Sequence, residues 1–397
     1  MTVATVAPPS RDSRLPSLTG MRFLAAVLVF VTHVAVADLF LDAGVNRFLH
    51  DYLSRAGYLG VEFFFVLSGF VLTWSAPAGD TPRRFLRRRF VKIYPNHFVT
   101  WFAGLLLMLW YGRQVSAGNT VPSLLLVQSW SPDLNVLGGT NGPSWTLACE
   151  LLFYLSFPWL HPLLKRIPAA RLWVAAGLVT AAVGAVPLLA QLLPDTPMSP
   201  FQPVSWWKQW FVYFLPAPRL LEFVLGILMA LIVRNDRWIG LGRVPALALV
   251  AAGYALMVLL PDAYGLVAPA ALPLALMIAA WAHGDTHGRR SLLAGRLMVW
   301  LGEVSFAFYI VHFLVFEYGP MGLSTQPAAA RAGTVPHTLG VVAVTFALSL
   351  AFGWLLYTLV ERPAMRRWRS PRRAGAPAAA PDPTEPAAVT TTLGSTP

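Results

Sequence analysis

Charged side chains are scarce in this chain of 397 residues. Asp, Glu, Lys and Arg make up 12% of the sequence and hydrophobic residues 56%, whereas a soluble domain carries about twice that charged fraction. The one cysteine, Cys149, excludes an intrachain disulfide framework and a multi-cysteine metal site. The sequence also lacks an internal repeat, a glycine-rich phosphate loop and the H-E-x-x-H spacing of zinc enzymes. These absences argue against a soluble or disulfide-rich class, and no metal is expected.

Apolar runs of about 20 residues recur along the whole chain, and this is the length that crosses a bilayer as a helix. The pattern predicts an all-α polytopic membrane protein with about ten transmembrane helices in one bundle. Two shorter apolar pieces, near 121–129 and 204–215, predict re-entrant or interfacial segments. The expected spans are 20–40, 58–76, 95–112, 144–163, 171–192, 216–233, 243–260, 264–282, 298–318 and 338–360.

Basic residues are concentrated in alternate connections between the expected spans. The net charge is +12, and Lys and Arg gather before 17, at 83–92, 165–171, 234–243 and 289–296, and after 361. The positive-inside rule therefore predicts a multi-pass protein of the cell membrane with both termini in the cytoplasm. The basicity is then a topology signal that also attracts anionic lipid, and no nucleic-acid partner is expected.

The chain is expected to hold one folded domain. Residues 1–17 are a cytoplasmic N-terminal segment without the pattern of a cleaved signal peptide. Residues 18–365 are the transmembrane domain. The last part, 366–397, is first basic and then rich in Pro, Ala and Thr, a composition that predicts a disordered tail.

Ionisable residues inside the apolar runs are the first candidates for function. Each costs about 2.5–3.5 kcal/mol at the centre of a membrane helix, so such residues usually face a protein interior. Arg22 and His33 are eleven positions apart, which is close to three helical turns, so they share one stripe about 16 Å apart along the axis. The depth of a residue in the membrane can be counted along its span from the predicted orientation. By this count, Glu62, Glu150 and His312 lie at a depth similar to that of His33.

These residues also have explanations that involve no catalysis. A histidine in a span is often bonded to a neighbouring helix, and Arg22, near a boundary, can reach lipid phosphates. Arg219 and Glu222 are i,i+3 neighbours that can neutralise each other. Cys149, beside Glu150, is a candidate nucleophile, although a buried small hydrophobic side chain explains it better.

Six segments, in order, resemble the acyltransferase 3 family of integral-membrane O-acyltransferases, and the resemblance runs to about residue 365. LTGMRFLAAVLVFVTHV (18–34) is similar to the opening block of the family, with an arginine, ten residues and a histidine. Lys92 departs from the usual arginine and loses bidentate geometry, while Thr146 and Phe306 replace a serine and a tyrosine. The other five segments are GVEFFFVLSGFVL (60–72), RRFVKIYP (88–95), NGPSWTLACELLFYLSFP (141–158), LGEVSFAFYIVHF (301–313) and VERP (360–363).

The resemblance implies transfer of an acyl group from acyl-CoA, as a co-substrate, to a hydroxyl of a sugar or natural product. His33 is then the general base, Glu150 the carboxylate that orients it, and Arg22 the third residue of the catalytic group. The pantetheine arm of coenzyme A, about 15–20 Å long at ordinary bond lengths, matches the spacing of Arg22 and His33. No tightly bound cofactor is implied.

Two further sets of residues follow from the same resemblance. The cytoplasmic basic loop is expected to hold the phosphates of the donor by charge-assisted hydrogen bonds. Its members are Arg88, Arg89, Lys92 and Tyr94. Further contacts to substrate are expected from Glu62, Ser68, Trp145, Tyr154, Tyr309 and His312.

Three questions stay open at this stage. The acceptor is either a macrolide-like antibiotic, as in a subgroup of similar length and composition, or a cell-envelope polysaccharide or glycolipid. Transfer is either direct or through an acyl-enzyme on His33 or Cys149. A transporter of acyl or glycolipid substrates is the alternative from another class, because intramembrane charges also mark transport pathways. Two related halves with interrupted helices, which would favour a transporter, are not found in the sequence.

Overall fold

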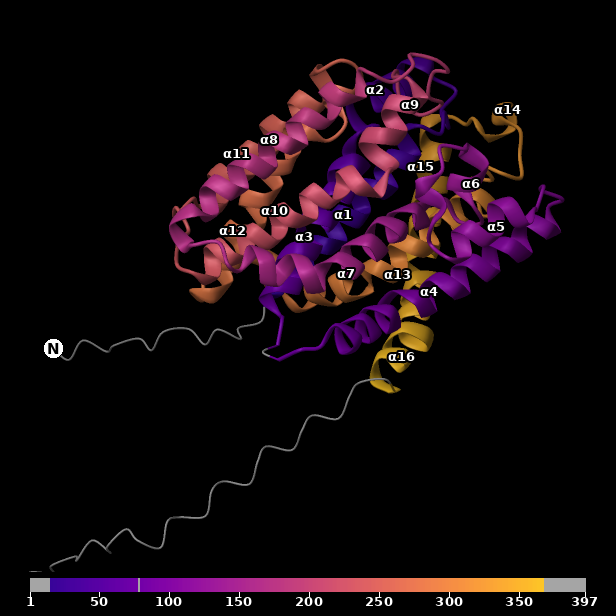
Figure 1. The fold of residues 1–397 in the computed structure, drawn as a ribbon. Coiled ribbons are helices and arrows are strands. Elements are labelled where there is room, and N and C mark those ends of the chain that lie inside the picture. The colour runs from indigo at the N-terminus through magenta and orange to yellow at the C-terminus, as the bar shows by residue number, and fades with distance from the viewer. Residues whose placement is uncertain (1–14, 78, 368–397) are drawn as a thin grey trace, which may run out of the picture.

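The protein folds into one bundle of helices, as the apolar runs predict (Figure 1). The structure, a computed structural model, describes residues 15–77 and 79–367, and its regular elements there are all helical apart from two isolated β-bridges. The expected N-terminal segment up to residue 14 and the expected disordered tail from residue 368 lie outside the described residues. The long helices are α1 (Pro16–Ala35), α3 (Ala56–Trp74), α4 (Pro82–Trp110), α7 (Trp145–Leu164), α8 (Leu172–Ala190), α10 (Pro216–Arg234), α11 (Arg243–Leu259), α12 (Ala268–Thr286), α13 (Arg296–Tyr318) and α15 (Val335–Leu356).

Short helices connect the long ones. The apolar piece near 204–215, expected at the membrane interface, forms α9 and a π-helical turn, Trp210–Phe214, that leads into α10. Trp206 in this piece is buried, and its indole N–H is satisfied by a hydrogen bond to the carbonyl of Pro132 at 2.6 Å. The short helices are α2 (Ala43–Leu53), α5 (Ala117–Leu124), α6 (Leu134–Gly138), α9 (Trp206–Gln209), α14 (Ala328–Arg331) and α16 (Arg362–Arg367).

Each of the ten expected spans coincides with a long helix. Eight helices among the described residues are long and apolar enough to cross a membrane. The other two are α4, whose first half carries the basic cluster 83–92, and α11, which has 17 residues. At 1.5 Å per residue α11 is about 26 Å long, slightly short of a hydrocarbon core of about 30 Å. The polytopic all-α class is confirmed, while α4 and α11 stay predictions as membrane spans.

Close packing places α3 at the centre of the bundle. Helix α3 packs against α10, α1 and α12. Gly69 of α3 and Gly226 of α10 allow this, because a methyl group at either position would collide with a backbone carbonyl of the facing helix. The backbones therefore approach closely, as small residues permit in membrane bundles.

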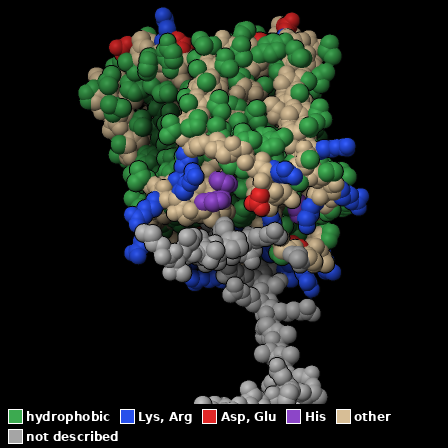
Figure 2. Space-filling view, turned by 90° about the vertical axis from the view of Figure 1, so that its left-hand side faces the viewer, with side chains coloured by type: hydrophobic (Ala, Val, Ile, Leu, Met, Phe, Trp, Pro, Cys, Tyr) green, Lys and Arg blue, Asp and Glu red, His purple; other side chains and the backbone are tan. Residues whose placement is uncertain are grey.

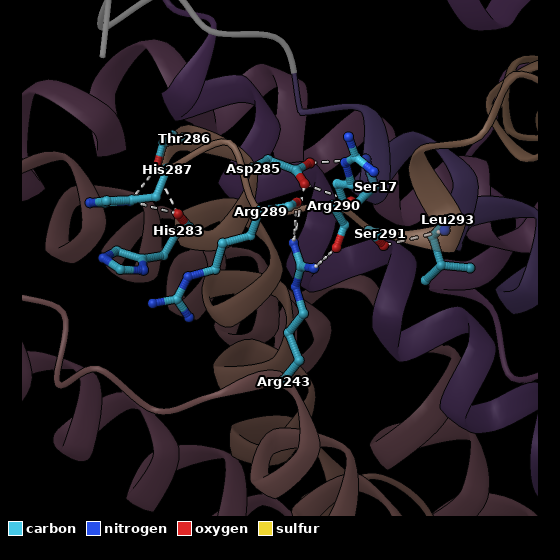
Figure 3. Close-up of polar contacts among 10 residues, drawn as sticks. All are labelled: Ser17, Arg243, His283, Asp285, Thr286, His287, Arg289, Arg290, Ser291 and Leu293. Carbon is cyan, nitrogen blue, oxygen red and sulfur yellow. Dashed lines mark hydrogen bonds and ion pairs between the residues drawn. The ribbon is translucent and has the colours of Figure 1, made fainter. Parts of the chain in front are cut away.

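The start of α1 is fixed by a residue from another helix (Figure 3). Leu15 at the N-cap position of α1 provides no side-chain acceptor. Asp285 at the end of α12 instead accepts hydrogen bonds from the Ser17 backbone N–H at 2.9 Å and the Ser17 Oγ–H at 2.6 Å. Arg243 donates to the same carboxylate at 3.5 Å and to the carbonyl of Arg290 at 2.7 Å. An acidic cap satisfies orphan N–H groups and matches the helix dipole, so the axial position of α1 is set here.

The surface is apolar over the body of the bundle. Figure 2 shows hydrophobic side chains across this face, with most of the visible Lys, Arg and His side chains gathered toward the lower end of the view. In Figure 1, α16 and the start of α1 lie at that end, while α2, α9 and α14 lie at the opposite end. We call the first the basic end and the second the loop end. The positive-inside rule predicts that the basic end faces the cytoplasm.

Candidate active site

Two helices, α3 and α7, border three cavities in succession. The outer cavity, about 470 Å³, meets α3 at Tyr58 and α7 at Trp145. The middle cavity, about 40 Å³, meets them at Phe65 and Glu150 and shares Val61 with the outer cavity. The inner cavity, about 600 Å³, meets them one or more turns further on, at Leu72 and Phe157. The three cavities thus follow the helix axes from the loop end to the basic end.

The outer cavity contains His33. Its walls are mostly apolar and include residues from the loop end, namely 36–38, 200–202 and the short helix α6. The His33 ring lies 4.8 Å from the Phe313 ring and 5.3 Å from the His312 ring, measured between centroids. Among the described residues, neither ring nitrogen of His33 has a hydrogen-bond partner, so both stay available to a ligand. Aromatic residues of the wall are Tyr58, Trp145, Phe201, Tyr213, Phe214 and Phe313.

His312 lies behind His33 and outside the cavity wall. Its side chain is fully buried on α13, with Nδ1 2.5 Å from the carbonyl oxygen of Tyr309. Its Nε2 has no partner in the part of the chain that the structure describes. Sequence reasoning placed His312 at the correct level but expected it to contact substrate, whereas the structure places it against the ring of His33.

Glu150 is not beside His33, contrary to the expectation from depth counting. It lies in the middle cavity with Arg22 and accepts a hydrogen bond from the Tyr154 hydroxyl at 2.7 Å. The turn Gly142–Ser144 before α7 already reaches the outer cavity, so Glu150 lies about two helical turns deeper than His33. The expected contact between this carboxylate and the imidazole is therefore wrong, although Glu150 and Arg22 still share a cavity.

Tyr309 borders the middle cavity from α13. Its hydroxyl lies 3.1 Å from Thr146 Oγ1 and donates to the carbonyl of Pro143 at 3.2 Å. These bonds fix α13 against α7 between the levels of His33 and Glu150. Thr146 replaces the serine that is usual in the resembling family, and it retains the hydroxyl that makes this contact.

The inner cavity is basic. Arg88 and Arg89 border it as expected, and the structure adds three residues that the sequence reasoning did not assign to a site, namely His161, Lys165 and Arg234. From the sequence, Lys165 and Arg234 are expected only to set the topology, because a positive charge alone cannot distinguish a topology signal from a residue of a binding site. Arg88 pairs with Asp80, with one contact of 3.1 Å. Lys165 is exposed, and no described residue pairs with it.

Phe157 and His161 stack with ring centroids 5.0 Å apart. Phe85 also stacks on Phe157, with ring centroids 4.9 Å apart, and all three rings border the inner cavity. The cavity therefore offers both cationic groups and flat rings. Such a combination suits a ligand with phosphates and a planar base.

Of four further residues expected at the site, Lys92 lies next to the middle cavity, 6.0 Å from the ring centre of Phe306, and the other three lie elsewhere. The Lys92 ammonium pairs with the buried carboxylate of Glu361, whose second oxygen accepts from Asn96 at 2.6 Å. The Tyr94 hydroxyl donates to the carbonyl of Leu124 at 3.5 Å, and its ring stacks on Phe90. Ser68 and Glu62 border none of the three cavities. Lys92 is also an electrostatic neighbour of Arg22 and Glu150, and its contact with the donor stays a prediction.

Glu62 belongs instead to a buried charge cluster. Its side chain is fully buried, and neither carboxylate oxygen has a hydrogen-bond partner among the described residues. Its electrostatic neighbours are Glu222 and Arg219 on α10, which pair at 2.9 Å. The Arg219 guanidinium also lies 4.9 Å from the Phe65 ring centre and 5.1 Å from that of Tyr213. The predicted neutralisation of Arg219 by Glu222 is thus present, with Glu62 as a third member.

Comparison with known proteins gives consistent matches. A family model described as an acyltransferase domain matches residues 15–374. Acyltransferase MdmB of Streptomyces mycarofaciens is 42% identical over 364 residues, which cover 90% of this chain and 93% of the relative. Exopolysaccharide production protein ExoZ of Rhizobium meliloti is 28% identical over 80% of this chain and 92% of its own length. Putative peptidoglycan O-acetyltransferase YrhL of Bacillus subtilis is 24% identical over 88% of this chain and 54% of its own length. No solved structure matches.

Proposed function

The chain belongs to the acyltransferase 3 family of membrane acyltransferases, and on that premise we propose that it moves an acyl group from acyl-CoA to a hydroxyl in the outer cavity. The observation that carries the proposal is the succession of cavities along α3 and α7. A basic cavity lies at one end and an aromatic cavity with an unbonded histidine at the other. A donor with a phosphate-rich head and a long arm fits such a path.

The donor head is assigned to the inner cavity. Arg89 and Lys165 supply positive charge there, and charge-assisted hydrogen bonds to phosphate are about twice as strong as neutral ones. The Phe157–His161 stack offers a face for the adenine ring. The pantetheine arm then passes Arg22 and Glu150 in the middle cavity, which at about 40 Å³ must widen as the arm enters.

The transfer step uses His33 as general base. The acceptor hydroxyl gives its proton to a ring nitrogen of His33 as its oxygen attacks the thioester carbonyl, which becomes a tetrahedral oxyanion. The carbon–sulfur bond then breaks, and the imidazolium returns the proton to the leaving thiolate, so that free coenzyme A is released. Atoms and charge balance without another reactant.

The oxyanion needs a hydrogen-bond donor near His33. Trp145 lines the same cavity, and no described residue accepts a hydrogen bond from its indole N–H. The indole is therefore our candidate for the oxyanion donor. Direct transfer is favoured over a thioester on Cys149, because that side chain is fully buried and borders none of the three cavities.

The acceptor is proposed to be a macrolide-like hydroxyl compound that enters from the loop end. The mostly apolar, aromatic wall of the outer cavity suits a large, weakly polar ring better than a highly hydrated sugar chain. Cell-envelope glycans are the second candidate, because relatives named as a peptidoglycan O-acetyltransferase and an exopolysaccharide production protein also match the chain.

The test is an assay of thiol release by the purified protein in detergent. With labelled acetyl-CoA and a panel of macrolides and wall glycans, we expect free thiol to appear together with a labelled macrolide. Labelling of glycans alone would select the second candidate. A protein that releases no thiol with any acceptor, yet moves substrate in vesicles, would be a transporter and would overturn the proposal.

A further inference from the structure

The tautomer of His312 is set by its surroundings. Its Nδ1 lies 2.5 Å from the carbonyl oxygen of Tyr309, and a carbonyl oxygen can only accept a hydrogen bond. The proton of neutral His312 is therefore assigned to Nδ1, and Nε2 carries a lone pair. The side chain is fully buried, so this lone pair cannot be satisfied by bulk water.

His312 Nε2 is a buried acceptor without a partner among the described residues. Such a group costs about 1–3 kcal/mol, so a protein retains one where it has a use. The rings around His312 are Phe30, Phe308, Tyr309, Phe313, Phe316 and His33. The nearest of them is His33, at 5.3 Å between centroids, and it is also the one that carries nitrogen atoms.

The separation of the two rings permits a hydrogen bond. Each nitrogen lies about 1 Å from its ring centroid, so rings 5.3 Å apart can bring two nitrogens to about 3 Å, a normal hydrogen-bond length. The bond is not made in the present orientation. His33 borders the open outer cavity, so its ring can turn, and hydrogen bonds of this kind often tighten only when substrate is bound.

We propose that His312 is the positioning residue for His33, the role that sequence reasoning gave to Glu150. One N–H of His33 donates to Nε2 of His312, whose own Nδ1–H donates to the carbonyl of Tyr309. This chain of bonds holds His33 in the tautomer whose other nitrogen carries a lone pair facing the cavity. That nitrogen accepts the proton of the acceptor hydroxyl, and the bond to His312 stabilises the resulting imidazolium.

This inference rests on the proposed function and extends it to a residue that touches neither substrate. In serine proteases, holding the histidine in the wrong tautomer lowers kcat by about 10⁴-fold. His312 is neutral where the protease has a carboxylate, so we expect a smaller effect of about 10²–10³-fold. The loss is expected in kcat and not in KM, because His312 acts on the orientation of His33 and contacts neither substrate.

The experiment compares His312→Phe, His312→Leu and His312→Gln in the thiol-release assay. Glutamine can place an amide oxygen near the position of Nε2 and accept the bond, whereas phenylalanine and leucine cannot. We expect both apolar variants to lose about 10²–10³-fold in kcat with both KM values nearly unchanged, and His312→Gln to retain activity within about tenfold. His287→Gln, at the basic end, is the matched control and should retain wild-type kinetics.

A second comparison separates positioning from a loss of folding. In a His33→Ala background, adding His312→Leu should lower the residual rate no further, because the residue that His312 acts on is already absent. Equal activity of His312→Gln and the apolar variants, whether high or low, would overturn the inference. So would a further loss in the double variant. Failure of the wild-type protein to transfer acyl groups would instead refute the proposed function.

Discussion

Arg219 offers the sharpest test of the interior of the bundle. It is the cation of a cluster with two carboxylates, Glu62 and Glu222, and all three side chains are buried. Its guanidinium pairs with Glu222 at 2.9 Å and lies between the rings of Phe65 and Tyr213. Replacing Arg219 by methionine fills most of the volume but leaves two acids in an apolar interior without a cation.

The expected cost follows from these contacts. Removing one partner of a buried ion pair typically lowers the free energy of unfolding by about 3–5 kcal/mol, because the other charge is left uncompensated. Loss of the two aromatic faces adds to this, since a desolvated cation–π contact contributes about 2 kcal/mol. These terms overlap, so about 3–5 kcal/mol is the prediction for Arg219→Met.

The assay is denaturant unfolding of the detergent-solubilised protein. The double variant Arg219→Met with Glu222→Gln should recover most of the loss, because removing both partners leaves a neutral interior. Glu62→Gln should keep the free energy of unfolding within about 1 kcal/mol of wild type, because an uncharged amide avoids burying a second negative charge. A fully stable Arg219→Met variant, or a double variant no better than the single one, would refute the charge argument.

Further predictions concern the path between the cavities and the start of α1. Trp145→Phe keeps the ring but removes the indole N–H, so kcat should fall about 10²–10³-fold at constant KM, and an unchanged kcat would exclude the oxyanion role. Lys165→Gln should raise the KM for acyl-CoA up to about fivefold at low salt and not at high salt, because exposed ion pairs are weak and screened. Asp285→Ala should lower the free energy of unfolding by about 1–2 kcal/mol through loss of the cap on Ser17, as measured by thermal unfolding, whereas unchanged stability would argue against that cap.

The positions of the helices could be predicted because a bilayer imposes one simple rule on every span. Each expected apolar run coincides with a helix, from 20–40 on α1 to 338–360 on α15. The separation of Arg22 and His33 also followed from sequence, because both lie on one continuous helix with a known rise. Each residue borders a cavity, Arg22 the middle one and His33 the outer one.

Contacts between different helices could not be predicted in the same way. The relative level of Glu150 and His33 depends on where each helix ends. Helix α7 begins at Trp145, close to the expected start, but α1 ends at Ala35 and not at residue 40, so His33 lies in the last turn of α1. The pairing of Lys92 with Glu361 joins residues 269 positions apart. Neither hydropathy nor charge counting contains information on helix rotation, so partners across helices come only from the packed structure.

The central claim is that His33 removes the proton from the acceptor hydroxyl. The most direct measurement is acceptor-dependent thiol release by purified wild-type protein and by His33→Ala, with binding of acyl-CoA measured in parallel. We expect the variant to bind the donor normally and to transfer at least about 10²-fold more slowly, the usual contribution of a general base. A folded His33→Ala protein that transfers acyl groups at the wild-type rate would contradict the account.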